Sequence, residues 1–250
     1  RSVQPQPGPA PEINFGTPKK HQFKNGLTLL VVENYKLPRV SVSLRIDNPL
    51  DTEGEKAGVS DLLSSMMGKG SKNIPKDDFD EEIDFMGARL NISSSGAYAG
   101  SLKRYFPRVY EMMADAALNP HFLPEEFQKE VDKTLEGIKS SEKDVKTAAR
   151  RVENLLSYGS DHPYGEYISE ESINKITLDD LQKRYYKNFN AQKAYVIIVG
   201  DIDFDTAKDL TEFYYAADAK AAWKQDGSAL EKTIEELERT VELIFSKISQ

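Results

Sequence analysis

Apolar and polar residues alternate in the first folded part of the chain, and this pattern predicts β-strands. Residues 38–47 place every second side chain on one face, as expected for a strand with one buried face. A shorter β-rich run covers residues 27–33. The Asn25-Gly26 pair before it predicts a tight hairpin with residues 21–24, because both residues tolerate a positive φ. Further strands are predicted at residues 89–92, 97–102 and 195–201.

Apolar residues three and four positions apart predict helices in the rest of the folded region. Phe79, Ile83 and Met86, for example, fall on one side of a helix over residues 78–86. The other predicted helices begin near Gly58, cover residues 107–118, 124–141, 144–158 and 177–187, and run from a cap at Asp205 to near Trp223. We therefore expect one folded domain over residues 21–224.

The two ends of the chain have different patterns. Residues 1–20 are rich in proline and poor in apolar groups, which predicts an extended arm, either a disordered leader or a strap along a partner surface. Residues 225–250 predict a C-terminal helix with apolar residues at heptad spacing. These apolar residues are Leu230, Ile234, Leu237, Val241, Ile244 and Ile248. Such a helix either packs on its own domain or forms a coiled coil with a second copy or another partner.

Composition and charge narrow the classes of function. The chain has 33 Lys and Arg residues against 41 Asp and Glu residues, a net charge of −8, and no basic stripe. These features disfavour nucleic acid and anionic membranes as partners. We expect no membrane-spanning segment, because no apolar run is long enough. The chain has no cysteine, which excludes disulfides. It begins at Arg1, so we expect a processed or trimmed N-terminus, which is compatible with export.

The segment with the most informative chemistry is Gly-Val-Ser-Asp-Leu-Leu-Ser-Ser-Met-Met-Gly-Lys-Gly-Ser at residues 58–71. It predicts an apolar helix that has the frame of a zinc-peptidase helix. The positions that should carry the zinc ligands and the catalytic carboxylate are Asp61, Ser64 and Ser65. A catalytic zinc helix needs imidazole ligands, and hydroxyls with a single carboxylate do not replace them. The three histidines His21, His121 and His162 have no second histidine at ligand spacing. We therefore predict no metal site and no cofactor.

The order and spacing of several segments resemble the N-terminal domain of the insulinase/pitrilysin metallopeptidase family, which includes the mitochondrial processing peptidase subunits. These segments are residues 27–33, 38–46, 58–71, 86–88 and 196–201, and the resemblance covers roughly residues 20–224. It implies an α+β fold in which a mixed, mainly antiparallel sheet has helices packed on one face. The proline-rich leader followed by Pro-Glu-Ile-Asn resembles exported bacterial members, which implies a periplasmic or otherwise exported location.

Active members of this family carry an inverted H-x-x-E-H zinc motif and a second glutamate ligand far downstream. On this chain the motif positions fall at Asp61, Ser64 and Ser65, and the distant glutamate position falls at Gly137, next to Glu136. All four positions are changed. The resemblance therefore implies a non-catalytic homologue that lacks the zinc expected in active relatives.

In active relatives a peptide substrate adds as a strand to the sheet edge beside the zinc helix. That edge corresponds here to Leu90, Asn91, Ile92 and Ser93. Strand addition uses main-chain groups, so it survives the loss of zinc ligands. An ordinary edge strand without a ligand is the plainer interpretation.

Three functions follow from these observations. The leading prediction is a substrate-binding or structural half of a zinc peptidase assembly, paired with an active homologue or a second homologous domain. A self-associating module with no peptide role, joined through residues 229–250, is the alternative. An active zinc metalloendopeptidase has only family membership in its favour.

Overall fold

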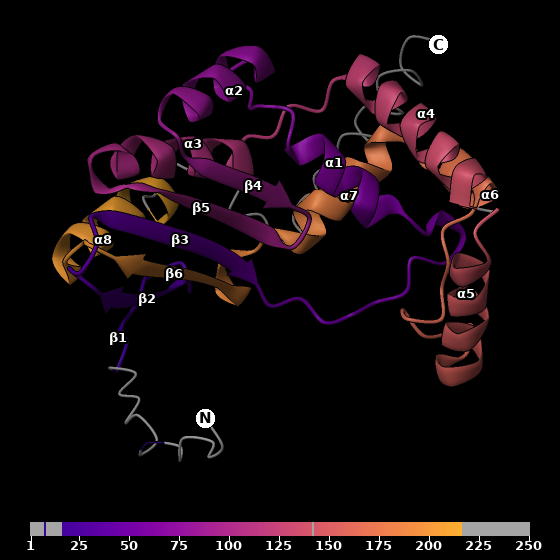
Figure 1. The fold of residues 1–250 in the computed structure, drawn as a ribbon, viewed down its shortest axis with the longest axis horizontal. Helices are drawn as coiled ribbons and strands as arrows, with labels where there is room; N and C mark the ends of the chain where they lie inside the picture. The colour runs from indigo at the N-terminus through magenta and orange to yellow at the C-terminus, as the bar shows by residue number, and fades with distance from the viewer. Residues whose placement is uncertain (1–7, 9–16, 142, 217–250) are drawn as a thin grey trace, which may run out of the picture.

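The computed structural model describes residues 8, 17–141 and 143–216, and its fold is a single sheet with helices (Figure 1). The strands are β1 Lys19–Gln22, β2 Thr28–Glu33, β3 Arg39–Ile46, β4 Arg89–Ser93, β5 Gly96–Leu102 and β6 Ala194–Gly200. The helices are α1 Val59–Met67, α2 Lys76–Phe85, α3 Phe106–Leu118, α4 Pro124–Ser141, α5 Val145–Tyr158, α6 Glu170–Asn174, α7 Leu178–Asn188 and α8 Phe204–Thr211, followed by a π-helical turn η4 Glu212–Ala216. None of these helices is long and apolar enough to cross a membrane.

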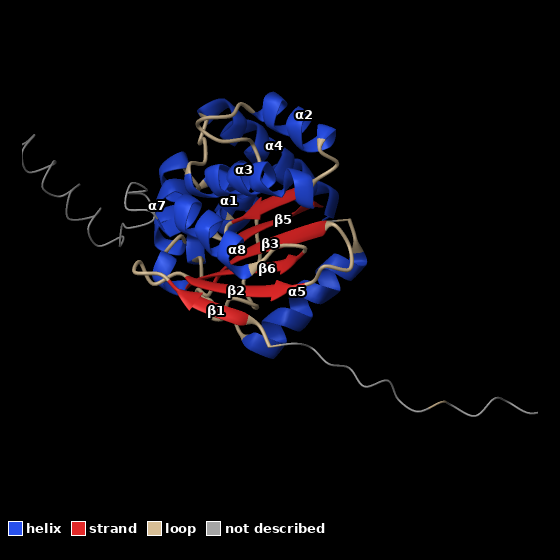
Figure 2. Cartoon of the chain, turned by 90° about the vertical axis from the view of Figure 1, so that its left-hand side faces the viewer, coloured by secondary structure: helices blue, strands red, loops and turns tan. Residues whose placement is uncertain are grey.

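The sheet is mixed and mainly antiparallel, as predicted. Its strand order is β1-β2-β6-β3-β5-β4, which leaves β1 and β4 at the two edges (Figure 1, with the sheet turned by 90° in Figure 2). Only the β2–β6 pair is parallel within the described sheet. The Asn25-Gly26 turn joins β1 to β2, so the predicted hairpin is confirmed, and Ser94 and Ser95 join the two predicted strands β4 and β5 in a second hairpin.

Helices cover one face of the sheet, and alternation within the strands explains why. In β3 the side chains of Val40, Val42, Leu44 and Ile46 are buried, whereas the residues between them are partly or fully exposed. The helices α1, α3 and α8 pack on the sheet from the apolar side. On the opposite side, Tyr98 and Tyr195 remain exposed. The structure therefore confirms the predicted α+β class with helices on one face.

The structure corrects the predicted boundaries at three points. The sheet begins at Lys19 rather than at residue 21, because Lys19 and Lys20 pair with β2 although neither side chain is apolar. The cap of α8 is Asp203 rather than Asp205, since the Asp203 side chain accepts the N–H of Thr206 at 2.9 Å. The short helix α6 was not predicted. The heptads of 225–250 and most of the 1–20 arm lie outside the described residues.

Candidate functional site

The helix α1 carries three of the four predicted site positions, and local sequence fixes where it begins. Gly58 has a φ of 104°, and a Cβ there would lie 2.8 Å from Ile173 Cδ1, so glycine is required for both backbone and space. The Glu53 carboxylate accepts the N–H of Gly58 at 2.7 Å and that of Ser60 at 3.2 Å. It therefore satisfies amide groups that open the helix. The inner face is buried through Val59, Leu62, Leu63, Met66 and Met67.

The outer face of α1 presents the residues that stand at the family's motif positions. Asp61 and Ser65 are exposed and lie one turn apart, while Ser64 is half-buried. The pKa of the Asp61 carboxyl is raised, mainly because the surrounding protein removes solvent, with a smaller contribution from the Glu53 carboxylate. The structure therefore places Asp61 and Ser65 on the same face of α1, four residues apart.

Ser64 connects α1 to the turn between β4 and β5. Its Oγ accepts the N–H of Ser94 at 2.9 Å, lies 3.0 Å from Ser94 Oγ, and donates to the carbonyl of Ser60 at 2.8 Å. The Ser94 carbonyl in turn accepts the side-chain amide of Asn188 in α7 at 3.3 Å. The residue predicted to stand at the catalytic glutamate position thus uses its hydroxyl in a structural contact.

Removing this hydroxyl should weaken the fold by a measurable amount. In Ser64→Ala the half-buried N–H of Ser94 loses its acceptor, so we expect the free energy of unfolding to fall by about 1 kcal/mol. Urea denaturation followed by circular dichroism measures this difference. The matched control is Ser65→Ala on the exposed face, which should stay within about 0.5 kcal/mol of the parent. Equal effects of the two changes would contradict the structural role of Ser64.

The fourth predicted position, Gly137, lies on α4, which packs against α1. Gly137 and Glu136 are both exposed, and a Cβ at Gly137 would have no atom within 4 Å. Lys69, two residues after α1, also forms an ion pair of 2.6 Å between its Nζ and Oε1 of the buried Glu130 in α4. The structure therefore brings α4, which carries Gly137, against α1, and neither described helix contributes a histidine.

A cleft of about 380 Å³ opens at the N-terminal end of α1. Arg184 of α7 organises one wall of it. Its guanidinium binds both oxygens of Asp51 at 2.7 and 2.8 Å, donates to Ser60 Oγ at 3.0 Å, and lies 3.4 Å from Glu53. These contacts hold the loop before α1 against α7. Glu166 supports the same loop by accepting the N–H groups of Glu53 and Gly54.

Charge in this cleft is predominantly acidic. Among the described lining residues, Asp51, Glu53, Asp61 and Glu166 face a single cation, Arg184. Hydrogen bonding to Arg184, followed by that to Lys187, lowers the pKa of the Asp51 carboxyl to about 2. Asp51 therefore stays ionised at any physiological pH, and the cleft wall keeps its ion pairs.

The predicted peptide-binding residues Leu90, Asn91, Ile92 and Ser93 all lie in β4, the outermost strand on the α1 side of the sheet. Ile92 is buried, Leu90 and Ser93 are half-buried, and Asn91 is exposed. Beside this strand, Asn91, Arg45 and Tyr98 line a hollow of about 240 Å³ on the open face of the sheet. The structure thus places these residues at a sheet edge next to α1.

The histidines are not gathered into one place. His21 lies in β1 beside Phe23, His121 lies between α3 and α4, and His162 stacks on Tyr158 after α5. Within the described ranges no group of three or more His, Cys, Asp or Glu side chains is arranged to hold a metal ion.

Comparison with known proteins assigns the chain to a family. The sequence model of the insulinase family, peptidase family M16, matches residues 29–167. The chain belongs to the insulinase family. Its curated relatives include an uncharacterized zinc protease of Rickettsia bellii, 28% identical over 211 residues, and subunit 1 of the bovine mitochondrial cytochrome b-c1 complex, 22% identical over 202 residues. These alignments cover 77% and 78% of this chain but 47% and 42% of the relatives.

Solved M16 structures share the fold. An inactive M16 peptidase domain from Pseudomonas fluorescens aligns with a TM-score of 0.71 and 22% identity, over 84% of this chain and 52% of that one. The first half of the periplasmic protease PqqL from Escherichia coli aligns with a TM-score of 0.64 and 20% identity, over 80% of this chain and 46% of that one. The chain therefore spans about half the length of the relatives that it matches.

The M16 positions of this chain do not fit a catalytic zinc ion. Asp61 supplies one carboxylate, Ser64 is bonded to Ser94, and Ser65 offers a neutral hydroxyl. Zinc in such sites takes nitrogen, thiolate and carboxylate ligands, usually three from the protein. Gly137 has no side chain to contribute. The residues at these M16 positions consequently leave the ion without an adequate donor set.

Two residues of the site, Glu53 and Arg184, were not predicted from the sequence. Glu53 precedes the helix it caps by several residues and is not the residue next to it. Arg184 lies more than 120 residues from its partners Asp51 and Ser60. The one available signal was that Arg184 occurs in an amphipathic helix, which does not distinguish a buried cation from a solvated one.

Proposed function

We propose that this chain is a non-catalytic M16 domain that contributes substrate binding or structural support to a zinc peptidase assembly. The observation that carries the proposal is the Ser64 contact. The position of the catalytic glutamate is occupied by a hydroxyl that joins α1 to the β4–β5 turn, and no imidazole stands at Asp61 or Ser65. In this proposal the catalytic carboxylate is lost, and Ser64 at the same position serves as a structural contact instead.

Binding of an extended peptide at β4 is the activity that remains open to such a domain. β4 is an edge strand next to α1, and strand addition depends on main-chain N–H and C=O groups rather than on metal ligands. The hollow beside Asn91 and Tyr98 offers space for a peptide side chain on the open face. Leu90, Asn91, Ile92 and Ser93 are the proposed peptide-binding residues.

The proposed partner is an active homologue or a second homologous domain. Support comes from length, because the chain matches about half of its relatives and aligns with the first half of PqqL. An exported location belongs to the same proposal, supported by the periplasmic location of PqqL and by the proline-rich leader. Fractionation of source cells with an antibody to the chain tests this location.

The purified chain tests the function itself. We expect no stoichiometric zinc by elemental analysis and no chelator-sensitive peptide hydrolysis, but saturable binding of unstructured fluorescent peptides measured by anisotropy. The control is the same peptide with its backbone amides methylated at alternate residues, which removes strand hydrogen bonds and should abolish binding. Chelator-sensitive hydrolysis would favour the active zinc metalloendopeptidase. Equal binding of both peptides would contradict edge addition.

A self-associating module is the second candidate, and one observation favours it. The apolar side of α5 is exposed to solvent, and residues 229–250 carry an apolar heptad pattern. A chain that self-associates but binds no peptide at all would support this alternative over the first.

A further inference from the structure

The helix α5 is turned so that its polar side faces the domain. Thr147, Arg151 and Asn154 are half-buried, and the Arg151 guanidinium lies 5.4 Å from the Tyr167 ring. The apolar side chains point the other way, with Val145 81% and Leu156 82% exposed. Ordinary surface helices show the opposite arrangement, with the apolar side on the core.

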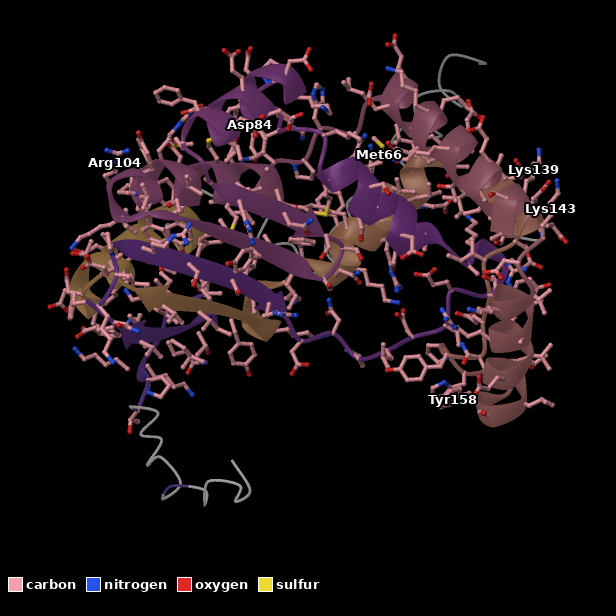
Figure 3. The ribbon with its side chains drawn as sticks, in the orientation of Figure 1. Met66, Asp84, Arg104, Lys139, Lys143 and Tyr158 are labelled. Carbon is pink, nitrogen blue, oxygen red and sulfur yellow. The ribbon has the colours of Figure 1, made fainter. Side chains whose placement is uncertain are left out.

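This apolar side is continuous rather than scattered. The apolar residues Val145, Ala148, Ala149, Val152 and Leu156 recur at helical spacing and, together with Glu153 and Ser157, line one shallow groove. α5 projects from one end of the molecule: Lys143 lies just before its first turn, and Tyr158 lies at its opposite end (Figure 3). The helix makes no more than isolated contacts with the other described elements. A helix of 14 residues is marginal in water without tertiary packing. The groove therefore needs a partner that supplies apolar side chains.

The heptad segment, residues 230–248 of this chain, has the matching chemistry. Built as a helix, this sequence would supply about one apolar side chain for each turn. Its length would be about 28 Å, against about 21 Å for α5. Its charge is also complementary. Lys146 and Arg150 are exposed beside the groove, and they outnumber Glu153, which lines it. In the tail, Glu231, Glu235, Glu236, Glu238 and Glu242 outnumber Lys232, Arg239 and Lys247.

Distance indicates which copy supplies the segment. The described chain ends at η4, which packs on α8, and α8 lies at the opposite end of the long axis from α5 (Figure 1). Residues 217–229 reach about 45 Å when fully extended. A domain of this size is roughly 40 Å across. A linker that follows the surface from η4 to α5 of the same chain would therefore need its full extended length, which favours the groove of a second copy.

We propose that two copies of this chain form a dimer in which the 230–248 segment of each copy binds the α5 groove of the other. The exchange is reciprocal, so both grooves are covered and the assembly closes at two copies. The inference does not depend on the proposed peptidase-related function. It uses a surface away from the M16 positions on α1.

Sedimentation equilibrium of full-length variants tests the exchange. The parent chain should be dimeric at micromolar concentration. The groove variant V152E/L156E and the tail variant L237E/V241E should each be monomeric, with the dissociation constant raised at least roughly a hundredfold, because each places carboxylates in an apolar contact. The matched control is Leu37→Glu in the loop between β2 and β3, a similarly exposed leucine that should leave the dimer intact.

Mixing the two monomeric variants separates exchange from other modes of association. The groove variant keeps an intact tail, and the tail variant keeps an intact groove, so the mixture should form a one-sided heterodimer. A monomeric parent chain would overturn the proposal. Dimers that persist in V152E/L156E but vanish in L237E/V241E would also overturn it, since they would indicate pairing of the tails alone. Unchanged thermal unfolding of both variants in the monomeric state shows that the domain itself still folds.

Discussion

Zinc should bind to this chain when Asp61 and Ser65 are both replaced by histidine (D61H/S65H). The two positions are exposed and one turn apart on α1, so two imidazoles there would point to the same side of the helix. We expect about one equivalent of zinc by elemental analysis after dialysis. A free zinc concentration one hundred times the dissociation constant should raise the free energy of unfolding by about 2.7 kcal/mol.

Adding Gly137→Glu to D61H/S65H tests the remaining family position. Gly137 is exposed on α4 and a Cβ added there meets no atom within 4 Å, so the change should not disturb the packing. A third ligand is expected to tighten zinc binding, because catalytic sites of this kind use three protein ligands. Isothermal titration of the double and triple variants measures the gain.

The control for this design is Ser65→His alone, which supplies one imidazole and should retain no zinc after dialysis. If D61H/S65H folds but behaves like the single variant, then the α1 face has diverged further than its residue types indicate. In that case the backbone positions on α1, and not only the side chains, would prevent zinc binding. The expected gain would instead show that only the ligand atoms were lost.

Local sequence patterns predicted the elements around this site well. Alternation in residues 38–47 and helical spacing in 124–141 gave strand and helix boundaries within a residue or two of β3 and α4. Such patterns succeed because the period of buried side chains is set by the backbone itself. The resemblance added what periodicity does not contain, namely the mixed sheet and the edge position of β4.

The contacts that define the site were not predictable in the same way. Ser64 and Ser94 are 30 residues apart, and Arg184 and Asp51 are 133 residues apart. Each pair depends on how helices and hairpins pack, and no local pattern encodes that. For α5 the pattern predicted a helix over residues 144–158 but not its orientation. In the structure Thr147, Arg151 and Asn154 are half-buried, and Arg151 lies over the Tyr167 ring.

Replacing Arg184 by methionine should be the most destabilising single change in the candidate site. The side chain is 14% exposed and binds Asp51, Ser60 and Glu53 together. Methionine keeps much of the apolar volume but removes the cation that Asp51 and Glu53 share, and Asp51 then keeps the exposed Lys187 as its partner. We expect the free energy of unfolding at pH 7 to fall by about 2–3 kcal/mol, below the range for fully buried pairs because water reaches Asp51.

The effect of Arg184→Met should depend on pH, and the direction follows from Asp51. Its pKa is about 2 in the folded parent chain against an ordinary value of 3.8. A lowered folded pKa contributes stability above about pH 4, and that contribution disappears as the pH falls towards 2. After screening by solvent it amounts to about 1–2 kcal/mol. The difference in stability between parent and variant should therefore shrink by about two thirds of this amount between pH 5 and pH 2.5, as measured by urea denaturation.

The variant Lys187→Met is the control for Arg184→Met. It distinguishes the effect of the buried Arg184 guanidinium from the effect of any positive charge near Asp51. Lys187 Nζ lies 2.5 Å from the same Asp51 carboxylate, but its side chain is 63% exposed. An exposed ion pair of this kind is worth less than about 1 kcal/mol, so the control should lose little stability at either pH. Equal losses in the two variants would mean that Asp51 responds to total positive charge nearby. A larger, acid-sensitive loss in Arg184→Met alone would show that the bidentate contact from α7 is what fixes the loop at the entrance of the cleft.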